Sequence, residues 1–224
     1  MNRMDASSDL ARAYALRFGE AADYRVAVWK ILISDFFQPI IGRDQSILDL
    51  GCGWGEFINQ IEASQRFGMD LNPDSSARLH PGIRFLEQNC AIPWALPDAS
   101  LDVVFTSNFL EHLPSKAEVD ATLAQVRRCL NPGGRIICLG PNIKYLAGRY
   151  WDFWDHFVPI TEASLCEVLR LRGFAIERCV ARFLPYTMSD GRRAPLWLIR
   201  AYIRMPWIWP LFGRQFLVIG RASA

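Results

Sequence analysis

Short apolar runs of β type alternate with amphipathic helical stretches from residue 46 onward. The runs predict seven strands, over residues 47–50, 66–70, 83–86, 101–106, 135–139, 174–183 and 215–221. Helical spacing between most of these runs indicates crossover helices, which join parallel strands and cover a sheet on both faces. The pattern therefore predicts a single α/β domain with a mostly parallel sheet.

Helix signals are clearest at four places along the chain. Residues 9–37 carry apolar positions at helical spacing, with a break near Gly19. We expect another helix over residues 56–63. Ser115 and Glu118 form a capping-box pattern ahead of a helix that runs to about residue 130. Within residues 195–212 the apolar positions again follow helical spacing, so we expect one helical element there.

Length and charge narrow the class of protein. The chain has 224 residues, of which 51% are hydrophobic, and its formal net charge is +2. This composition is sufficient for a packed core and excludes a largely disordered chain. A near-balanced charge gives no indication of a nucleic-acid partner. After Asp190, however, the sequence contains arginines and no acidic residue, which sets the C-terminal segment apart.

Cysteine spacing and hydropathy bear on compartment and metal content. None of the six cysteines belongs to a C-x-x-C pair, so we expect neither a disulfide framework nor a bound metal. The N-terminus lacks the apolar stretch of a signal peptide, and no charge-free run is long enough to span a membrane. These features predict a cytoplasmic protein.

A glycine-rich loop follows the first predicted strand. Gly51, Gly53 and Gly55 would let the backbone approach a ligand closely, and Asp70 ends the second strand. Ligands of open α/β sheets bind at the carboxyl ends of the strands, where an acidic residue can bind ribose hydroxyls. Both a dinucleotide and S-adenosylmethionine fit this arrangement.

Details of the loop favour the second ligand. The glycines follow the spacing G-x-G-x-G rather than G-x-G-x-x-G, and Asp49 stands just before them. A carboxylate at that place would repel a pyrophosphate but attract an ammonium and a sulfonium group. A dinucleotide-binding oxidoreductase remains the alternative.

Residues 47–55, with the sequence ILDLGCGWG, resemble the first motif of class I S-adenosylmethionine-dependent methyltransferases. Residues 89–94, 101–113 and 130–135 resemble later motifs of that family in the right order, over residues 46–139 in total. The resemblance implies a Rossmann-like seven-stranded sheet with the last strand antiparallel, and S-adenosylmethionine as cofactor. The cofactor-binding residues that it implies are Asp49, Gly51, Cys52, Gly53, Asp70, Leu71, Asn89, Cys90 and Asn108.

One of these positions departs from the family. Asn89 stands where the family often has an aspartate that accepts a hydrogen bond from the adenine amino group. An asparagine can still accept through its carbonyl oxygen, without the added strength of a charge. The other reading of Asn89 is a turn-forming residue at a strand end.

The resemblance implies methyl transfer to a small-molecule or lipid- or glycan-linked acceptor, and leaves open a non-catalytic, methyltransferase-like interaction domain. The candidate catalytic residues are His112, Asp155 and His156. We expect His156 to be the base, because it lies beside a carboxylate in the aromatic segment 150–157. The alternatives are a bracing role for His112 and an aromatic minicore around His156.

The predicted domain divides into consecutive parts with different roles. These are a helical cap (1–40), a cofactor-binding core (46–141), an acceptor-side loop, helix and sixth strand (142–183), a helical insert (184–214) and the last strand (215–224). The tryptophans and arginines of residues 195–212 make that stretch a candidate for peripheral contact with the inner face of a membrane. A lid or a dimer contact are the alternatives, and the oligomeric state stays open.

Overall fold

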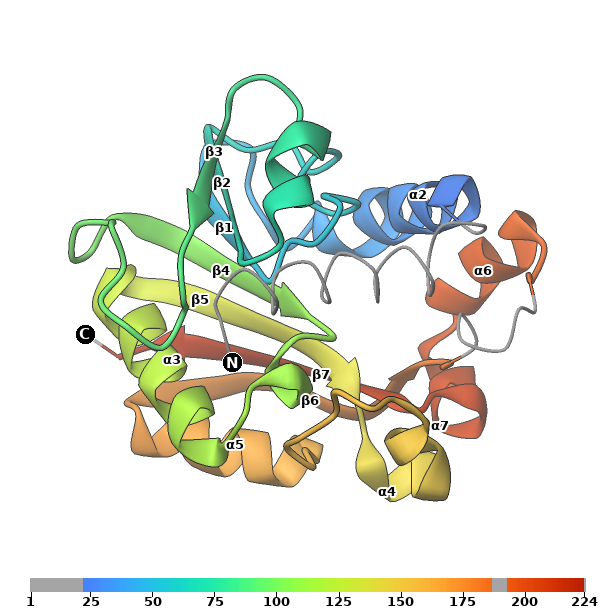
Figure 1. Cartoon of the computed structure of the whole chain (residues 1–224). Helices are drawn as coiled ribbons and strands as arrows, with labels where there is room; N and C mark the ends of the chain where they lie inside the picture. Colours follow the sequence, from blue (N-terminus) through green and yellow to red (C-terminus); the bar gives the residue numbers. More distant parts are fainter. Residues whose placement is uncertain (1–21, 187–192, 224) are drawn as a thin grey trace.

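A computed structural model describes residues 22–186 and 193–223. Within these residues one sheet has the strand order β3-β2-β1-β4-β5-β7-β6 (Figure 1). The strands are β1 (Ser46–Leu50), β2 (Gln65–Asp70), β3 (Ile83–Glu87), β4 (Leu101–Ser107), β5 (Leu130–Pro141), β6 (Phe174–Leu184) and β7 (Gln215–Ala222). β1 to β5 are parallel, and β7 runs antiparallel to both β5 and β6. The predicted seven-stranded α/β sheet with an antiparallel last strand is confirmed.

Helices cover both faces of this sheet, as predicted. The α-helices are α2 (Ala22–Leu32), α3 (Lys116–Cys129), α4 (Ile143–Leu146), α5 (Glu162–Leu171), α6 (Leu196–Ile203) and α7 (Trp209–Phe212). The π-helix η2 (Ile33–Phe37) and the 3-10 helices η3 (Pro73–Arg78), η4 (Leu110–His112), η5 (Ala147–Asp152) and η7 (Pro206–Ile208) complete the set. α3 and α5 pack on one face, and α2, α6 and α7 pack on the other.

Each face of the sheet has its own hydrophobic core. The alternation of β4 shows the division, because Val104 packs with α3 and α5 whereas Phe105 packs with α2. The second core is strongly aromatic: Phe105 stacks on Phe57 with 3.7 Å between ring centroids, and Trp29 and Phe37 meet Phe105 edge to face. The N-terminal helix α2 is thus anchored in the core of the domain, while residues 1–21 of the predicted cap lie outside the described residues.

The prediction of a helix over residues 56–63 is wrong. The segment forms consecutive turns instead, with the buried side chains of Phe57, Ile58 and Ile61 facing the aromatic core. The side-chain amide of Gln60 donates to the Glu56 carbonyl at 2.6 Å, whereas the Gln60 backbone N–H donates to the Phe57 carbonyl. A side chain thus occupies the carbonyl that a regular helical hydrogen bond requires.

The segment between β6 and β7 differs from the single helical element expected over residues 195–212. It forms α6, η7 and α7 in succession, because Pro206 and Pro210 lack the N–H that a continuous helix would use. α6 packs beside α2 (Figure 1). Asp35 supports this contact, since its carboxylate lies 2.8 Å from Arg204 and 3.4 Å from Arg200. In the described ranges, every helix is too short or too polar to cross a membrane.

Candidate functional site

The loop after β1 has the conformation that its glycines predict. Gly51, Gly53 and Gly55 all have positive φ values, of 74°, 51° and 78°. The backbone N–H groups of Gly51 and Cys52 both donate to the Met69 carbonyl, at 2.9 and 3.1 Å. The loop therefore turns tightly across the carboxyl end of β2, at a place where residues with a side chain would be strained.

Asp70 holds this loop from the end of β2. One carboxylate oxygen accepts a hydrogen bond from the Gly53 N–H, and the other accepts from the Asn72 N–H, both at 2.8 Å. The side chain is buried. Burial raises the pKa of Asp70, and these hydrogen bonds from the backbone oppose that rise. Asp70 thus fixes the positions of two loops at the edge of the sheet.

Two further carboxylates are buried around the loop. Asp49, on β1, has a pKa raised well above its ordinary value by burial and by the negative charges of Glu56 and Asp70. Glu56 forms a buried ion pair with Arg25 of α2 at 2.8 Å. Sequence reasoning did not find Glu56 or Arg25, because no local spacing connects residues so far apart. Because the Arg25 charge already balances Glu56, Asp49 and Asp70 are the acids that make the loop a favourable place for a positively charged ligand.

The other predicted cofactor-binding residues follow β1 to β4, at the edge of the sheet where ligands bind in open α/β folds. Cys52 is buried and Leu71 is half exposed. The Asn89 side-chain oxygen accepts from the Ala91 N–H at 2.8 Å, so that oxygen already forms a turn. The Cys90 carbonyl accepts from the Trp94 indole at 2.8 Å. Asn108 has a positive φ of 49°, which turns the chain sharply after β4.

The predicted catalytic residues come together at a second cluster. The ring nitrogen Nδ1 of His112 lies 2.9 Å from the Asp155 carbonyl oxygen and 3.2 Å from an Asp155 carboxylate oxygen. The rings of His112 and His156 are 4.7 Å apart. Asp155 therefore pairs with His112, whereas the sequence suggested a pairing with its neighbour His156.

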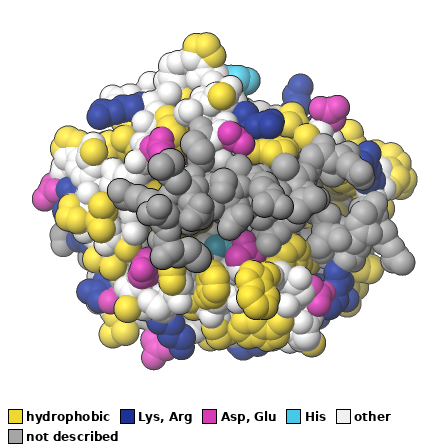
Figure 2. Space-filling view, viewed as in Figure 1, with side chains coloured by type: hydrophobic (Ala, Val, Ile, Leu, Met, Phe, Trp, Pro, Cys, Tyr) yellow, Lys and Arg dark blue, Asp and Glu magenta, His cyan; other side chains and the backbone are white. Residues whose placement is uncertain are grey.

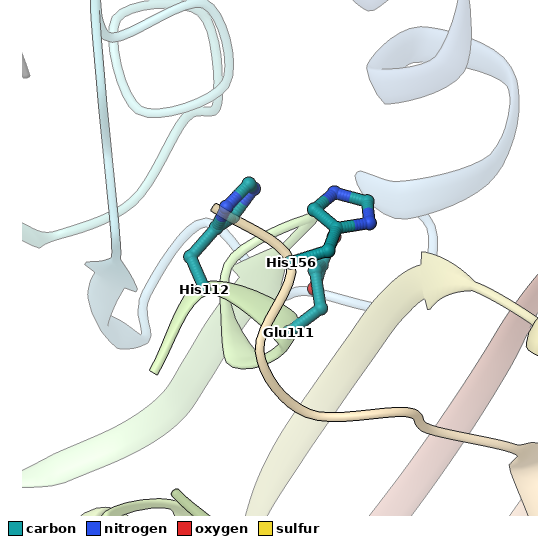
Figure 3. A group of neighbouring side chains, drawn as sticks. All are labelled: Glu111, His112 and His156. Carbon is teal, nitrogen blue, oxygen red and sulfur yellow. The ribbon is translucent and has the colours of Figure 1, made fainter. Parts of the chain in front are cut away.

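Glu111 is a member of this cluster that the prediction missed (Figure 3). Its carboxyl group is buried, and burial raises its pKa to about 7. Burial alone would lower the pKa of His112, but the hydrogen bond that its ring donates to Asp155 and the negative charge of Glu111 outweigh burial and raise that pKa. The sequence signal was the adjacent pair Glu111-His112, for which the bracing role was the alternative.

Aromatic side chains enclose the cluster, and one of them connects it to the glycine loop. The rings of Tyr150 and Phe153 lie 4.8 and 4.9 Å from the His156 ring. Phe109, just before η4, packs against Gly51 so closely that a Cβ there would lie 2.3 Å from its ring. On the face shown in Figure 2, a histidine is visible between acidic and hydrophobic side chains. The two clusters thus adjoin at the carboxyl ends of β1 and β4.

Several known proteins similar to this chain are named as methyltransferases. A family profile described as a methyltransferase domain matches residues 21–178. A probable S-adenosylmethionine-dependent methyltransferase of Mycolicibacterium smegmatis is 30% identical over 148 residues, which are 63% of this chain and 56% of that protein. A demethylmenaquinone methyltransferase of Symbiobacterium thermophilum is 25% identical over 133 residues, 52% of this chain and 51% of that protein. The chain thus spans about half the length of these curated relatives.

Solved structures show the same fold at low sequence identity. A methyltransferase solved in complex with the Haloferax volcanii Trm112 methyltransferase activator superposes with a TM-score of 0.68 and 17% identity. That match covers 95% of this chain and 97% of the other. A methyltransferase dependent on S-adenosylmethionine from Archaeoglobus fulgidus gives a TM-score of 0.61 and 22% identity, over 86% and 92% of the two chains.

Replacing Gly51 by alanine should destabilise the loop more than a positive φ alone explains. We expect Gly82→Ala, at a φ of 88° with open space around it, to lower the free energy of unfolding by about 1–2 kcal/mol. Gly51→Ala should lower it by roughly 1–3 kcal/mol more, because the added methyl group meets the Phe109 ring. Urea unfolding followed by circular dichroism measures both losses. Equal losses would show that Phe109 moves aside freely.

Proposed function

Because the chain belongs to the class I S-adenosylmethionine-dependent methyltransferase family, we propose that it transfers a methyl group to a small-molecule or lipid- or glycan-linked acceptor. S-adenosylmethionine is the cofactor of this family. The observation that carries the proposal is the glycine loop surrounded by the buried carboxylates Asp49, Glu56 and Asp70. Burial and the negative charges of Glu56 and Asp70 raise the pKa of Asp49, and a ligand with positive charges would favour the ionised form of that carboxyl group.

The residues at this edge of the sheet fit such a cofactor. Gly51 and Gly53 leave the backbone bare of side chains, and Asp70 offers a carboxylate beside it. We assign the cofactor-binding role to the residues that the sequence predicted, which are Asp49, Gly51, Cys52, Gly53, Asp70, Leu71, Asn89, Cys90 and Asn108. Asn89 would contribute through its side-chain N–H groups or backbone, since its oxygen bonds Ala91. Residues 46–141 would thus hold the cofactor.

The acceptor would lie on the other side of Phe109, beside the second cluster. When bound, S-adenosylmethionine supplies a methyl group activated by a positively charged sulfur. In the transfer, the acceptor would form a bond to the methyl carbon through its lone pair as the carbon–sulfur bond breaks, and it would release its proton. We assign this proton to three residues, which are His112 of η4 and Asp155 and His156 of the acceptor-side segment 142–183. Tyr150 and Phe153 would exclude water around them.

The two alternative functions, a dinucleotide-binding oxidoreductase and a non-catalytic interaction domain, would use the glycine loop differently. A dinucleotide would place its pyrophosphate beside Asp49, which burial and two acidic neighbours already make costly to ionise. A non-catalytic interaction domain would have no use for the carboxylates as a ligand site. Ligand binding therefore discriminates among the three functions.

Calorimetric titration with S-adenosylhomocysteine and with NADH tests the cofactor assignment. We expect S-adenosylhomocysteine to bind and NADH not to bind. Asp70→Ala should weaken the binding by about tenfold or more, because a charge-assisted hydrogen bond contributes roughly 1.5–3 kcal/mol. Glu167→Ala, an exposed acid on α5, is the matched control. Binding of NADH alone would favour the oxidoreductase, and binding of neither would favour the interaction domain.

Substitution at the second cluster should separate cofactor binding from transfer. We expect His156→Ala to retain S-adenosylhomocysteine affinity and to reduce kcat by about a hundredfold or more, the usual contribution of acid–base groups. Transfer of tritium-labelled methyl groups to a panel of hydroxyl- and amine-bearing compounds provides the assay. His80→Ala, an exposed histidine after η3, is the control. An unchanged rate in His156→Ala would remove this residue from the mechanism.

We also propose that the insert, residues 184–214, serves amphiphilic acceptors at the inner face of a membrane. Trp197 and Trp207 are 71% and 74% exposed, and arginines lie close to them at positions 200 and 204. Tryptophan and arginine together suit the boundary between anionic headgroups and acyl chains.

Vesicle sedimentation tests the membrane contact. The protein should sediment with anionic vesicles at low salt and progressively less as salt screens the arginines. The double variant Trp197→Ala/Trp207→Ala should lose most of this binding. Leu171→Ala, which removes a similarly exposed apolar side chain from α5, should bind like the unmodified chain. Equal sedimentation with neutral and anionic vesicles, or none with either, would contradict the membrane contact. A lid or a dimer contact would then be the remaining roles of the insert.

A further inference from the structure

Three side chains of metal-binding type converge beside the aromatic segment. Glu111 and His112 belong to η4, and His156 lies in the loop after η5. One ligand atom from each lies within 4.8 Å of those of the other two. Figure 3 shows both imidazole rings extending to the same side of their segments, with the Glu111 side chain reaching toward His156.

Backbone hydrogen bonds fix this convergence. The N–H groups of Phe157 and Val158 both donate to the Glu111 carbonyl oxygen, at 2.9 and 3.1 Å. The segment after η5 is thus bound directly to η4. Because these hydrogen bonds join the two segments, rotation of the three side chains would leave their backbones in place and the side chains next to one another.

The cluster is buried on all sides except at His112, where solvent can reach it. Glu111 and His156 are only 2% and 5% exposed, whereas the His112 side chain is 27% exposed. An ion could therefore enter past His112 and be held by two side chains that water scarcely reaches. Low access to water strengthens the attraction between a cation and a carboxylate.

Asp155 orients His112 as a ligand. Two Asp155 oxygens lie next to Nδ1 of His112, at 2.9 and 3.2 Å, and both are hydrogen-bond acceptors. In the neutral ring the proton therefore belongs on Nδ1, which leaves the lone pair on Nε2 available. A carboxylate or carbonyl that binds the second ring nitrogen is the usual support of metal-binding histidines.

Charge gives a further reason for a cation at this place. In residues 22–186 and 193–223, the Glu111 carboxyl group forms no ion pair with lysine or arginine, and the positive group that favours its ionised form is His112. A buried carboxylate without a strong positive partner is costly, and a divalent cation would supply that charge.

From this geometry we propose that Glu111, His112 and His156 bind a divalent transition-metal ion of the zinc type. Two imidazoles and one carboxylate suit zinc and its neighbours, and three protein ligands leave a position open for substrate. Bonds of about 2.0–2.2 Å to a tetrahedral ion separate its donors by roughly 3.3–3.6 Å. The ligand atoms now lie within 4.8 Å of one another, and side-chain rotations that move them by about an ångström would bring them to that separation.

The consequence for catalysis rests on the proposed function. An acceptor hydroxyl in the open position would bind the cation through its oxygen, which lowers the pKa of the hydroxyl. Its proton would pass to solvent, and the oxygen lone pair would then attack the methyl carbon. With the ion bound, the cluster would act on the acceptor's proton through the ion, in place of the direct acceptance by these side chains given under the proposed function.

Zinc titration of the full chain tests the site independently of methyl transfer. The protein is prepared without a histidine tag, treated with a chelator, dialysed and titrated with zinc chloride by calorimetry. We expect one zinc ion per chain. Glu111→Gln should weaken the affinity at least tenfold, and Asp155→Ala should weaken it by about 10–100-fold through the lost support of His112. His80→Ala, which removes an exposed histidine, should leave the affinity unchanged.

Circular dichroism and S-adenosylhomocysteine binding report whether each variant is folded. If Glu111→Gln does not fold, His112→Ala replaces it, because this side chain lies at the exposed edge. Absence of stoichiometric zinc binding, or zinc binding that Glu111, His112 and Asp155 variants leave unchanged, would overturn the metal site. Such a result with intact S-adenosylhomocysteine binding would leave the methyltransferase proposal standing. Zinc binding without S-adenosylhomocysteine binding would support the metal site and contradict the methyltransferase proposal.

Discussion

The carboxylate of Asp70 is the interaction on which the candidate site depends. It is buried at the end of β2, and both its oxygens accept backbone N–H groups, from Gly53 and from Asn72. These bonds offset part of the cost of taking a charge out of water. They also hold the glycine loop and the start of η3 at fixed positions. The ligand edge of the sheet is therefore shaped by a polar interaction, although the sheet itself is stabilised by two apolar cores.

The two cores make different contributions to the site. The core under α3 and α5 fixes the ends of the parallel strands. The aromatic core around Phe105 anchors α2, and α2 carries Arg25 to its ion pair with Glu56. α2 also contacts α6 of the insert. One helix thereby connects the acidic glycine loop with the exposed tryptophans, so a change in its packing would reach both regions.

The sequence predicted most of the fold because the information there is local. Apolar runs of β type located all seven strands, and the glycines at 51, 53 and 55 correctly indicated positive φ values. The prediction failed over residues 56–63 because the side chain of Gln60 captures a carbonyl that helical spacing assigns to the backbone. The insert differed from one helical element because Pro206 and Pro210 divide it. The spacing of apolar residues does not reveal the effect of a single side-chain hydrogen bond or of a single proline.

The site was predicted less completely because its contacts join distant residues. Asp49 and Asp70 could be found from their places at strand ends. The ion pair of Arg25 with Glu56 and the approach of Glu111 to His156 depend on packing between segments. Asp155 illustrates the difficulty, since adjacency in sequence suggested His156 as its partner and the fold gives it His112. Residue type indicated which side chains to consider, but the topology decided which of them lie together.

The ends of the insert lie close together in space. Leu184 pairs with Gln215 across β6 and β7, and the Arg214 N–H donates to the Leu184 carbonyl at 2.7 Å. A connection that leaves and returns at one point of a hairpin changes its loop-closure entropy only slowly with length, by about 0.6 kcal/mol for each doubling. Added residues in the exposed parts of this connection would therefore cost the sheet little, whereas Tyr202, Ile203 and Trp209 of the insert belong to the aromatic core. The antiparallel edge of the fold is thus a place where the length of the chain can vary while the parallel strands keep their ligand edge unchanged.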